Sequence, residues 1–162
     1  MYVEVDPNPC LYPKFQEIVE FFGADKNKYV FIESPFEKAL LPDMTYDLIL
    51  TSPPFFSLEV YSNDENQSIH NRDLNAWFDD FLIESLNKAW SVLDRGGHMV
   101  IVINDIPSNK RLNLPSVNYT ELMVNVFNGL HEDATFECVI SYAQFENNEP
   151  RQPQPAWIWY KV

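Results

Sequence analysis

The chain has 162 residues, 46% of them hydrophobic and 15% aromatic, which is typical of one globular domain with a sizeable core. Its 24 acidic and 11 basic residues give a net charge of −13, which argues against tight, unaided binding to DNA or RNA. It has two cysteines without a CxxC pair, three scattered histidines, and no apolar run of about 18–20 residues. These features exclude a disulfide scaffold and a membrane span, and they argue against a zinc site. They favour an intracellular, cytoplasmic protein, or a virion component if the source is viral, with reduced and buried thiols.

The predicted elements alternate between strands and helices along one domain that spans residues 1–162. Apolar runs predict strands, in chain order, at 2–5, 28–34, 46–51, 98–105, 135–145 and 155–162. Helical periodicity predicts helices at 13–23, 75–97 and 118–130. Strands without alternation, separated by helices, indicate an α/β fold with a mostly parallel sheet covered on both faces. The last two strands suggest an antiparallel pair that makes the sheet mixed.

The run Tyr46–Thr51 stops abruptly at Ser52-Pro53-Pro54, and two phenylalanines follow at once. Two successive prolines form a stiff arm without amide donors, which leaves backbone carbonyls free to accept hydrogen bonds from a ligand. A ring next to those carbonyls suits a planar molecule that carries an amino group. The alternative is a strand-ending turn whose phenylalanines fill the core. In a parallel sheet, ligands bind beyond the carboxyl ends of strands, which is where this motif lies.

The motif and its context resemble the class I S-adenosylmethionine-dependent methyltransferases, and specifically those that act on the exocyclic amino nitrogen of a base. Their [D/N/S/T]-P-P-[Y/F/W] tetrad corresponds to Ser52–Phe55. A group of phage and bacterial methyltransferases also shares, in the same order, Asp6–Pro9, a helix with Trp77, Gly96–His98 and the ending Pro153–Val162. The resemblance covers nearly the whole chain and implies a Rossmann-like sheet.

The resemblance implies roles for individual residues. Asp6, at the end of a strand, would accept hydrogen bonds from the ribose hydroxyls of S-adenosylmethionine, although it could instead cap the following turn. Phe36 would lie against the adenine ring, or belong to the core. The full set of implied cofactor-binding residues is Asp6, Ser34, Pro35, Phe36 and Thr51.

The same resemblance places the reaction at the tetrad. Ser52 and the Pro53 carbonyl would hold the target amino group, and Phe55 would stack on a base taken out of its helix. The nitrogen would attack the methyl group in line, without a covalent intermediate. The implied catalytic residues are Ser52, Pro53, Pro54 and Phe55, and the implied substrate-binding residues are Phe56, Glu59 and Tyr61.

One part of the family pattern is absent. The first strand and its glycine-rich turn, which approach the methionine part of the cofactor, have no counterpart, and the four glycines form no such loop. In the usual order the first strand lies between the second and the fourth, so its loss would leave two unpaired inner edges. Three explanations are open: a fragment or split half completed by another segment, a sheet closed up over the gap, or residues 2–9 serving as the first strand.

Two functions therefore compete. The chain is either a DNA or RNA base amino-methyltransferase that needs a partner or missing segment to bind its cofactor, or an inactive methyltransferase-like scaffold or interaction module. A weaker variant of the first replaces the base by a protein glutamine amide. In each case we expect a protein partner or a homo-oligomer to cover the exposed sheet edges.

Overall fold

A computed structural model describes residues 1–56, 73–106, 116, 118–142, 145–146, 149–150 and 154–162. The strands are β1 (Tyr2–Asp6), β2 (Tyr29–Glu33), β3 (Tyr46–Thr51), β4 (Leu93–Val102), β5 (Ala134–Tyr142), β6 (Phe145–Glu146), β7 (Glu149–Pro150) and β8 (Gln154–Lys161). The helices are α1 (Leu11–Phe21), α2 (Leu74–Trp77), α3 (Glu84–Val92) and α4 (Tyr119–Leu130). Short 3-10 turns lie at Lys26–Lys28 and Phe36–Lys38, and a π-helical segment, Phe78–Ile83, joins α2 to α3. No helix among these residues is long and apolar enough to cross a membrane.

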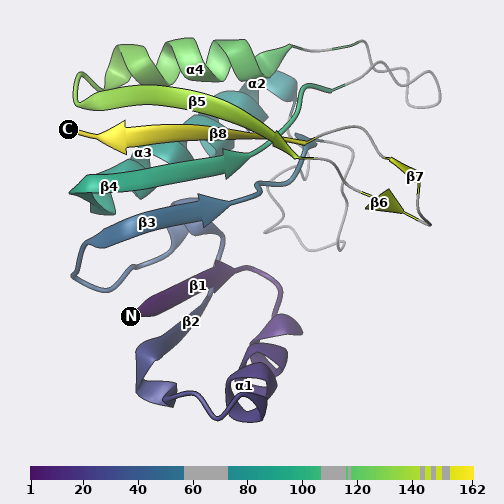
Figure 1. Ribbon diagram of the computed structural model, residues 1–162, viewed down its shortest axis with the longest axis vertical. Helices are drawn as coiled ribbons and strands as arrows, with labels where there is room; N and C mark the ends of the chain where they lie inside the picture. The colour runs from purple at the N-terminus through teal and green to yellow at the C-terminus, as the bar shows by residue number, and fades with distance from the viewer. Residues whose placement is uncertain (57–72, 107–115, 117, 143–144, 147–148, 151–153) are drawn as a thin grey trace.

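The strands form two main sheets rather than one (Figure 1). β1 pairs in parallel with β2 alone. The other sheet has the order β3-β4-β8-β5, in which β3 and β4 are parallel and β8 is antiparallel to both of its neighbours. The expected α/β class and the antiparallel C-terminal strands are confirmed. β1 and β3 are not paired, so the sheet has not closed up over the gap.

The core lies on one face of the four-stranded sheet. Met99 and Ile101 of β4 and Trp159 of β8 are fully buried there, against α3 and α4. Trp159 donates its indole N–H to Asn128 Oδ1 at 2.9 Å and packs edge-on against Phe127. The period-two spacing of Trp157 and Trp159 predicts that they share one side of the last strand, and both do pack on its core side.

The opposite face of this sheet is open among the described residues, which corrects two predictions. We expected helices on both faces and a fully buried strand at 46–51. Instead, Leu48 and Leu50 are 56% and 66% exposed, while Ile49 between them packs against the core. The alternation appears because neither α1 nor any other described helix supplies a layer over this side of β3.

Local signals set several element boundaries. α1 begins after Asn8, whose Oδ1 accepts from the Cys10 amide at 3.0 Å, and it ends before Gly23 at φ +60°. The Asp73 carboxylate accepts from the Ala76 amide and begins α2. Gly97 is required where β3 and β4 approach, because a Cβ there would lie 3.0 Å from the Asp47 carbonyl oxygen.

Two other predictions were wrong. The helical periodicity of residues 13–23 predicts one apolar face that includes Ile18 and Phe22, but Ile18 is 53% exposed, and Phe22, which directly follows α1, is 74% exposed. Both cysteines, Cys10 and Cys138, are exposed rather than buried. These apolar and thiol groups have no described layer above them.

The open face leads to a stability prediction for two neighbouring strands. Leu50→Ala should change the free energy of unfolding by no more than about 0.5 kcal/mol, because the side chain already meets solvent. Ile101→Ala, on the buried face, should lower it by about 2–5 kcal/mol. Urea denaturation of both variants measures the difference. Similar losses at the two positions would show that the Leu50 face is covered.

Candidate functional site

The tetrad lies where the sequence places it, directly after β3. Ser52 is exposed, Pro53 is buried, and Pro54 and Phe55 are half-buried. Since β3 and β4 are parallel, the tetrad shares its edge of the sheet with the residues that follow β4. The motif is therefore at the carboxyl edge, where ligands bind in such sheets.

Both phenylalanines of the motif contact the core. Phe55 and Phe56 pack against the buried cluster, and the Phe56 ring meets Trp77 edge-on with centroids 5.8 Å apart. Phe56 has φ 26°, an unusual backbone angle for a residue with a Cβ. The tight turn directs the chain away from β3 and anchors it on Trp77. The core-filling interpretation of these rings is thus met in part, while Phe55 stays partly accessible.

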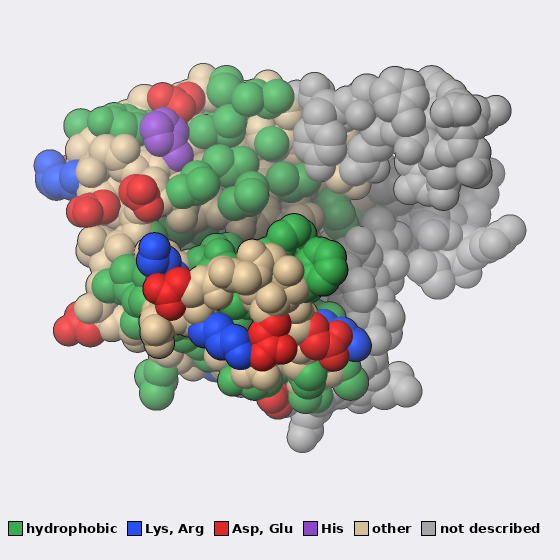
Figure 2. Space-filling view, turned by 60° about the horizontal axis from the view of Figure 1, so that its bottom comes forward, with side chains coloured by type: hydrophobic (Ala, Val, Ile, Leu, Met, Phe, Trp, Pro, Cys, Tyr) green, Lys and Arg blue, Asp and Glu red, His purple; other side chains and the backbone are tan. Residues whose placement is uncertain are grey.

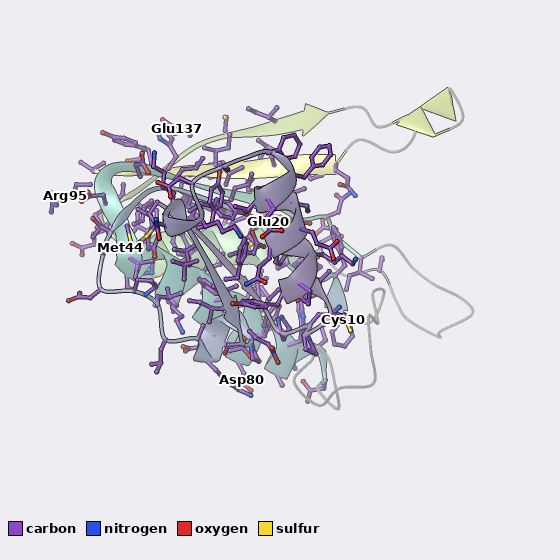
Figure 3. The ribbon with its side chains drawn as sticks, turned by 90° about the horizontal axis from the view of Figure 1, so that it is seen from below. Cys10, Glu20, Met44, Asp80, Arg95 and Glu137 are labelled. Carbon is purple, nitrogen blue, oxygen red and sulfur yellow. The ribbon has the colours of Figure 1, made fainter. Side chains whose placement is uncertain are left out.

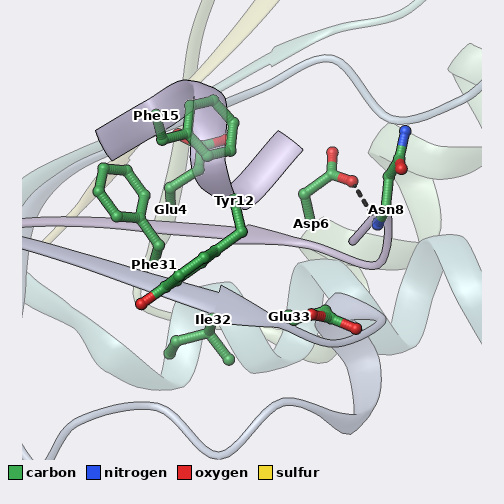
Figure 4. A pocket seen from close by; sticks show the side chains of 8 residues that line it. All are labelled: Glu4, Asp6, Asn8, Tyr12, Phe15, Phe31, Ile32 and Glu33. Atoms are coloured by element: carbon green, nitrogen blue, oxygen red, sulfur yellow. Dashed lines mark hydrogen bonds between the residues drawn. The ribbon is translucent and has the colours of Figure 1, made fainter. Parts of the chain in front are cut away.

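Asp6 ends β1 as predicted. Its Oδ1 accepts from the Asn8 amide at 2.8 Å, and its carbonyl oxygen accepts from the Ser34 amide at 3.2 Å (Figure 4). The carboxylate therefore caps the turn toward α1 with one oxygen. Asp6 also lines a small pocket of about 10 Å³ that is open to solvent, together with Glu4, Asn8 and Glu33 (Figure 4).

The residues after β2 are engaged with the rest of the protein. Ser34 Oγ donates to the Pro35 carbonyl oxygen at 3.1 Å. Phe36 packs against the core, with Lys88 Nζ 5.7 Å from its ring centroid. Burial lowers the pKa of Lys88, although the nearby Glu37 carboxylate opposes that shift. The Phe36 ring therefore has a structural role, because it packs against the core.

The structure joins the predicted residues into two groups. The Ser34 amide donates a hydrogen bond to the Asp6 carbonyl oxygen, which joins the ends of β2 and β1. Thr51, which is exposed, and the tetrad follow β3. The arrows of β1 and β3 point to the same side of the molecule, so both groups lie toward one edge (Figure 1). Glu59 and Tyr61 lie outside the described residues.

Sequence reasoning did not single out the segment after β4. Asp105 Oδ1 accepts from both the amide and the hydroxyl of Thr120 at 2.9 Å, and so caps α4. The Asn104 carbonyl oxygen accepts from the Tyr119 hydroxyl, whose ring meets Trp77. The signal was an Asn-Asp pair that ends an apolar run. No group of metal-ligating side chains occurs within the described part of the chain.

Comparison with known proteins gives a fold and no closer relationship. No family model and no curated protein matches the sequence. The structure is similar to the N-methyltransferase NodS from Bradyrhizobium japonicum, with a TM-score of 0.60, 11% identity, and coverage of 98% of this chain and 72% of that one. It is also similar to an rRNA methylase from Streptococcus thermophilus, with a TM-score of 0.55, 11% identity, and coverage of 99% and 72%. It is similar as well to a putative methyltransferase from Streptococcus mutans in complex with SAH, with a TM-score of 0.55, 12% identity, and coverage of 99% and 75%.

These similarities show that the chain has a methyltransferase-like fold. The residues fit the cofactor only in part. Asp6 offers a carboxylate oxygen suited to a hydroxyl, but the adjoining pocket is small and Phe36 is packed against the core. Gly23, Gly96, Gly97 and Gly129 form no turn near Asp6 or the tetrad. The methionine half of a cofactor has no cradle among the described residues of this chain.

We therefore expect the isolated chain to bind S-adenosylmethionine no more tightly than millimolar, because one half of the site is missing. Isothermal titration calorimetry of the 162-residue chain measures this affinity. Asp6→Ala should weaken this binding further, whereas Leu122→Ala, at an exposed position of α4, serves as the control and should leave it unchanged. Micromolar binding that Asp6→Ala abolishes would contradict the partial site.

Proposed function

We propose that this chain is the base-receiving part of an amino-methyltransferase, which transfers a methyl group from S-adenosylmethionine to an exocyclic amino nitrogen of a DNA or RNA base. The observation that carries the proposal is the Ser52–Phe55 tetrad at the carboxyl edge of β3 in a methyltransferase fold. Asp6 supports it as a ribose acceptor, and the partial cofactor fit requires another segment to complete the site.

The tetrad residues divide the work by their chemistry. Ser52 is exposed and can accept or donate a hydrogen bond at the amino group. The Pro53 and Pro54 carbonyl oxygens can accept hydrogen bonds from the amino group, and neither proline adds a backbone donor next to them. Phe55 offers a ring fixed against the core, and stacking of a base on such a ring contributes about 1–3 kcal/mol. Specificity for an amino group follows from these acceptors beside one aromatic plane.

The charge of the chain restricts the nucleic-acid substrate. A net charge of −13 disfavours the binding of a long phosphate backbone. An unpaired base in a short single strand, or a substrate delivered by a basic partner, meets fewer of these acidic groups. The proposal therefore takes an unpaired cytosine or adenine as the substrate class.

A second candidate is a catalytically inactive scaffold with the same fold. It is favoured by the packing of Phe55, Phe56 and Phe36 against the core. Under this interpretation the tetrad survives as a turn that holds β3 to the helices. The two candidates differ in whether removal of the Ser52 hydroxyl matters for chemistry.

The test is label transfer from S-adenosylmethionine, at millimolar concentration, to short single-stranded DNA and RNA oligonucleotides. We expect slow transfer to cytosine or adenine, and a loss of about tenfold or more in Ser52→Ala and Phe55→Ala, because each removes a contact to the base. Leu122→Ala, at an exposed position of α4, is the matched control, and this variant should transfer the methyl group at the original rate.

Transfer that is insensitive to both tetrad substitutions would contradict the assigned roles. Complete absence of transfer, in the chain alone and in the chain bound to a completing segment, would favour the scaffold.

A further inference from the structure

The inner edges of the two sheets lie alongside each other. β1 pairs only with β2, and β3 pairs only with β4, so each has one free edge among the described residues. Figure 1 shows β1 next to β3, with both arrows pointing to the same side. No backbone hydrogen bond within the described part of the chain joins them. Such edges are templates for an added strand.

The geometry restricts what can fill this gap. A whole row of edge N–H and C=O groups is satisfied by water, by side chains or by another backbone, and only an added strand pairs with the row in regular register. A strand parallel to both would continue the direction of β1 and β3. It would match their lengths of 5 and 6 residues.

The open face of the four-stranded sheet limits which element can come after such a strand. The pairing register places Leu48 and Leu50 of β3 on one face with Val100 of β4 and Ile158 of β8. Ile140 of β5 is 52% exposed and pairs with Ala156 in the same sheet. Figure 2 shows hydrophobic side chains spread over the upper part of the view, above a recess. The recess separates them from the unit of β1, α1 and β2, which lies at the front.

A helix is the element that suits this face. Parallel strands are joined by crossovers, commonly helical, that lie on a face of the sheet. An inserted parallel strand therefore brings a helix toward the open apolar face. In the similar NodS and S. thermophilus structures, 72% of each chain is matched, which leaves chain beyond the matched part.

The charge around the gap favours a basic occupant. Asp47 of β3 is exposed and Glu4 of β1 is half-buried. Glu137, which is labelled in Figure 3, belongs to β5 at the far edge of the four-stranded sheet and does not border the gap. The whole chain has 24 acidic against 11 basic residues, so lysines and arginines on the solvent side of the helix would be complementary.

We propose that β1 and β3 together bind one strand of a partner protein, parallel to both, followed by a basic amphipathic helix that covers the Leu48–Leu50 face. The proposal adds the partner to the function proposed above. It depends only on the sheet geometry, and its test reads out binding rather than methyl transfer. It therefore stands or falls separately from catalysis.

The test uses the full chain as bait for two display libraries. Each member of the first has a five-residue apolar strand followed by a basic amphipathic helix. The matched second library has a proline in the middle of the strand. We expect the first library to be enriched about tenfold over the second, since proline removes a ladder donor. Leu50→Asp should abolish the enrichment, and Leu122→Asp on α4 should not.

Amide exchange of the bait with a selected binder then locates the strand. Slower exchange in both β1 and β3 is expected. Equal enrichment of the two libraries, or slower exchange only in β2 or β5, would overturn the proposal. Slower exchange in β3 caused by a second copy of the chain, seen as a concentration-dependent dimer in sizing, would also overturn it. If Leu50→Asp fails to fold, the exchange map of the unsubstituted chain still decides.

Discussion

The backbone groups at the inner edges of β1 and β3 are the constraint on which the rest of this structure depends. An interior strand of a sheet needs a neighbour on each side, and these two strands each have one among the described residues. Because the two edges are not paired with each other, the described strands form separate sheets. The exposed apolar face and the partial cofactor site have the same origin. One added strand with its crossover helix would join the two sheets, cover the apolar face and complete the cofactor site.

Something other than strand pairing therefore holds the N-terminal unit in place. Lys88 of α3 donates to the carbonyl oxygens of Glu37 and Ala39 at 3.1 and 2.5 Å, and its ammonium lies over the Phe36 ring. Ala39 is 4% exposed, so these bonds lie close to the core. One cation thus fixes the segment between β2 and β3 against a helix. The Phe36 ring therefore has a structural role that does not depend on a bound nucleotide.

The sequence was sufficient where local chemistry decides the outcome. The alternation of strands and helices, the strand before Ser52–Phe55 and the paired tryptophans of β8 all depend on short-range patterns and appear as expected. The missing first strand was also foreseeable, because the resemblance supplied a strand order to compare. The predictions that failed concern which faces of the sheet and helices are covered by another layer of the fold. Leu48 and Leu50 resemble core residues because their apolar run does not alternate, and only the lack of a covering helix among the described elements exposes them. The same holds for Phe22 and for both cysteines. At the site, the Asp6 turn was among the weighed alternatives, whereas the Asp105 cap depends on a contact with Thr120 that no spacing rule shows.

The central claim is that β1 and β3 are not paired with each other in a methyltransferase-like fold, which leaves each of them with one free edge among the described residues. Nuclear Overhauser contacts between backbone protons of the isolated chain test this most directly, because they report strand neighbours one by one. The account predicts cross-strand contacts between β1 and β2, between β3 and β4, and along β8, with none between β1 and β3. A regular series of contacts between β1 and β3 would show that the sheet closes up, and would contradict the account.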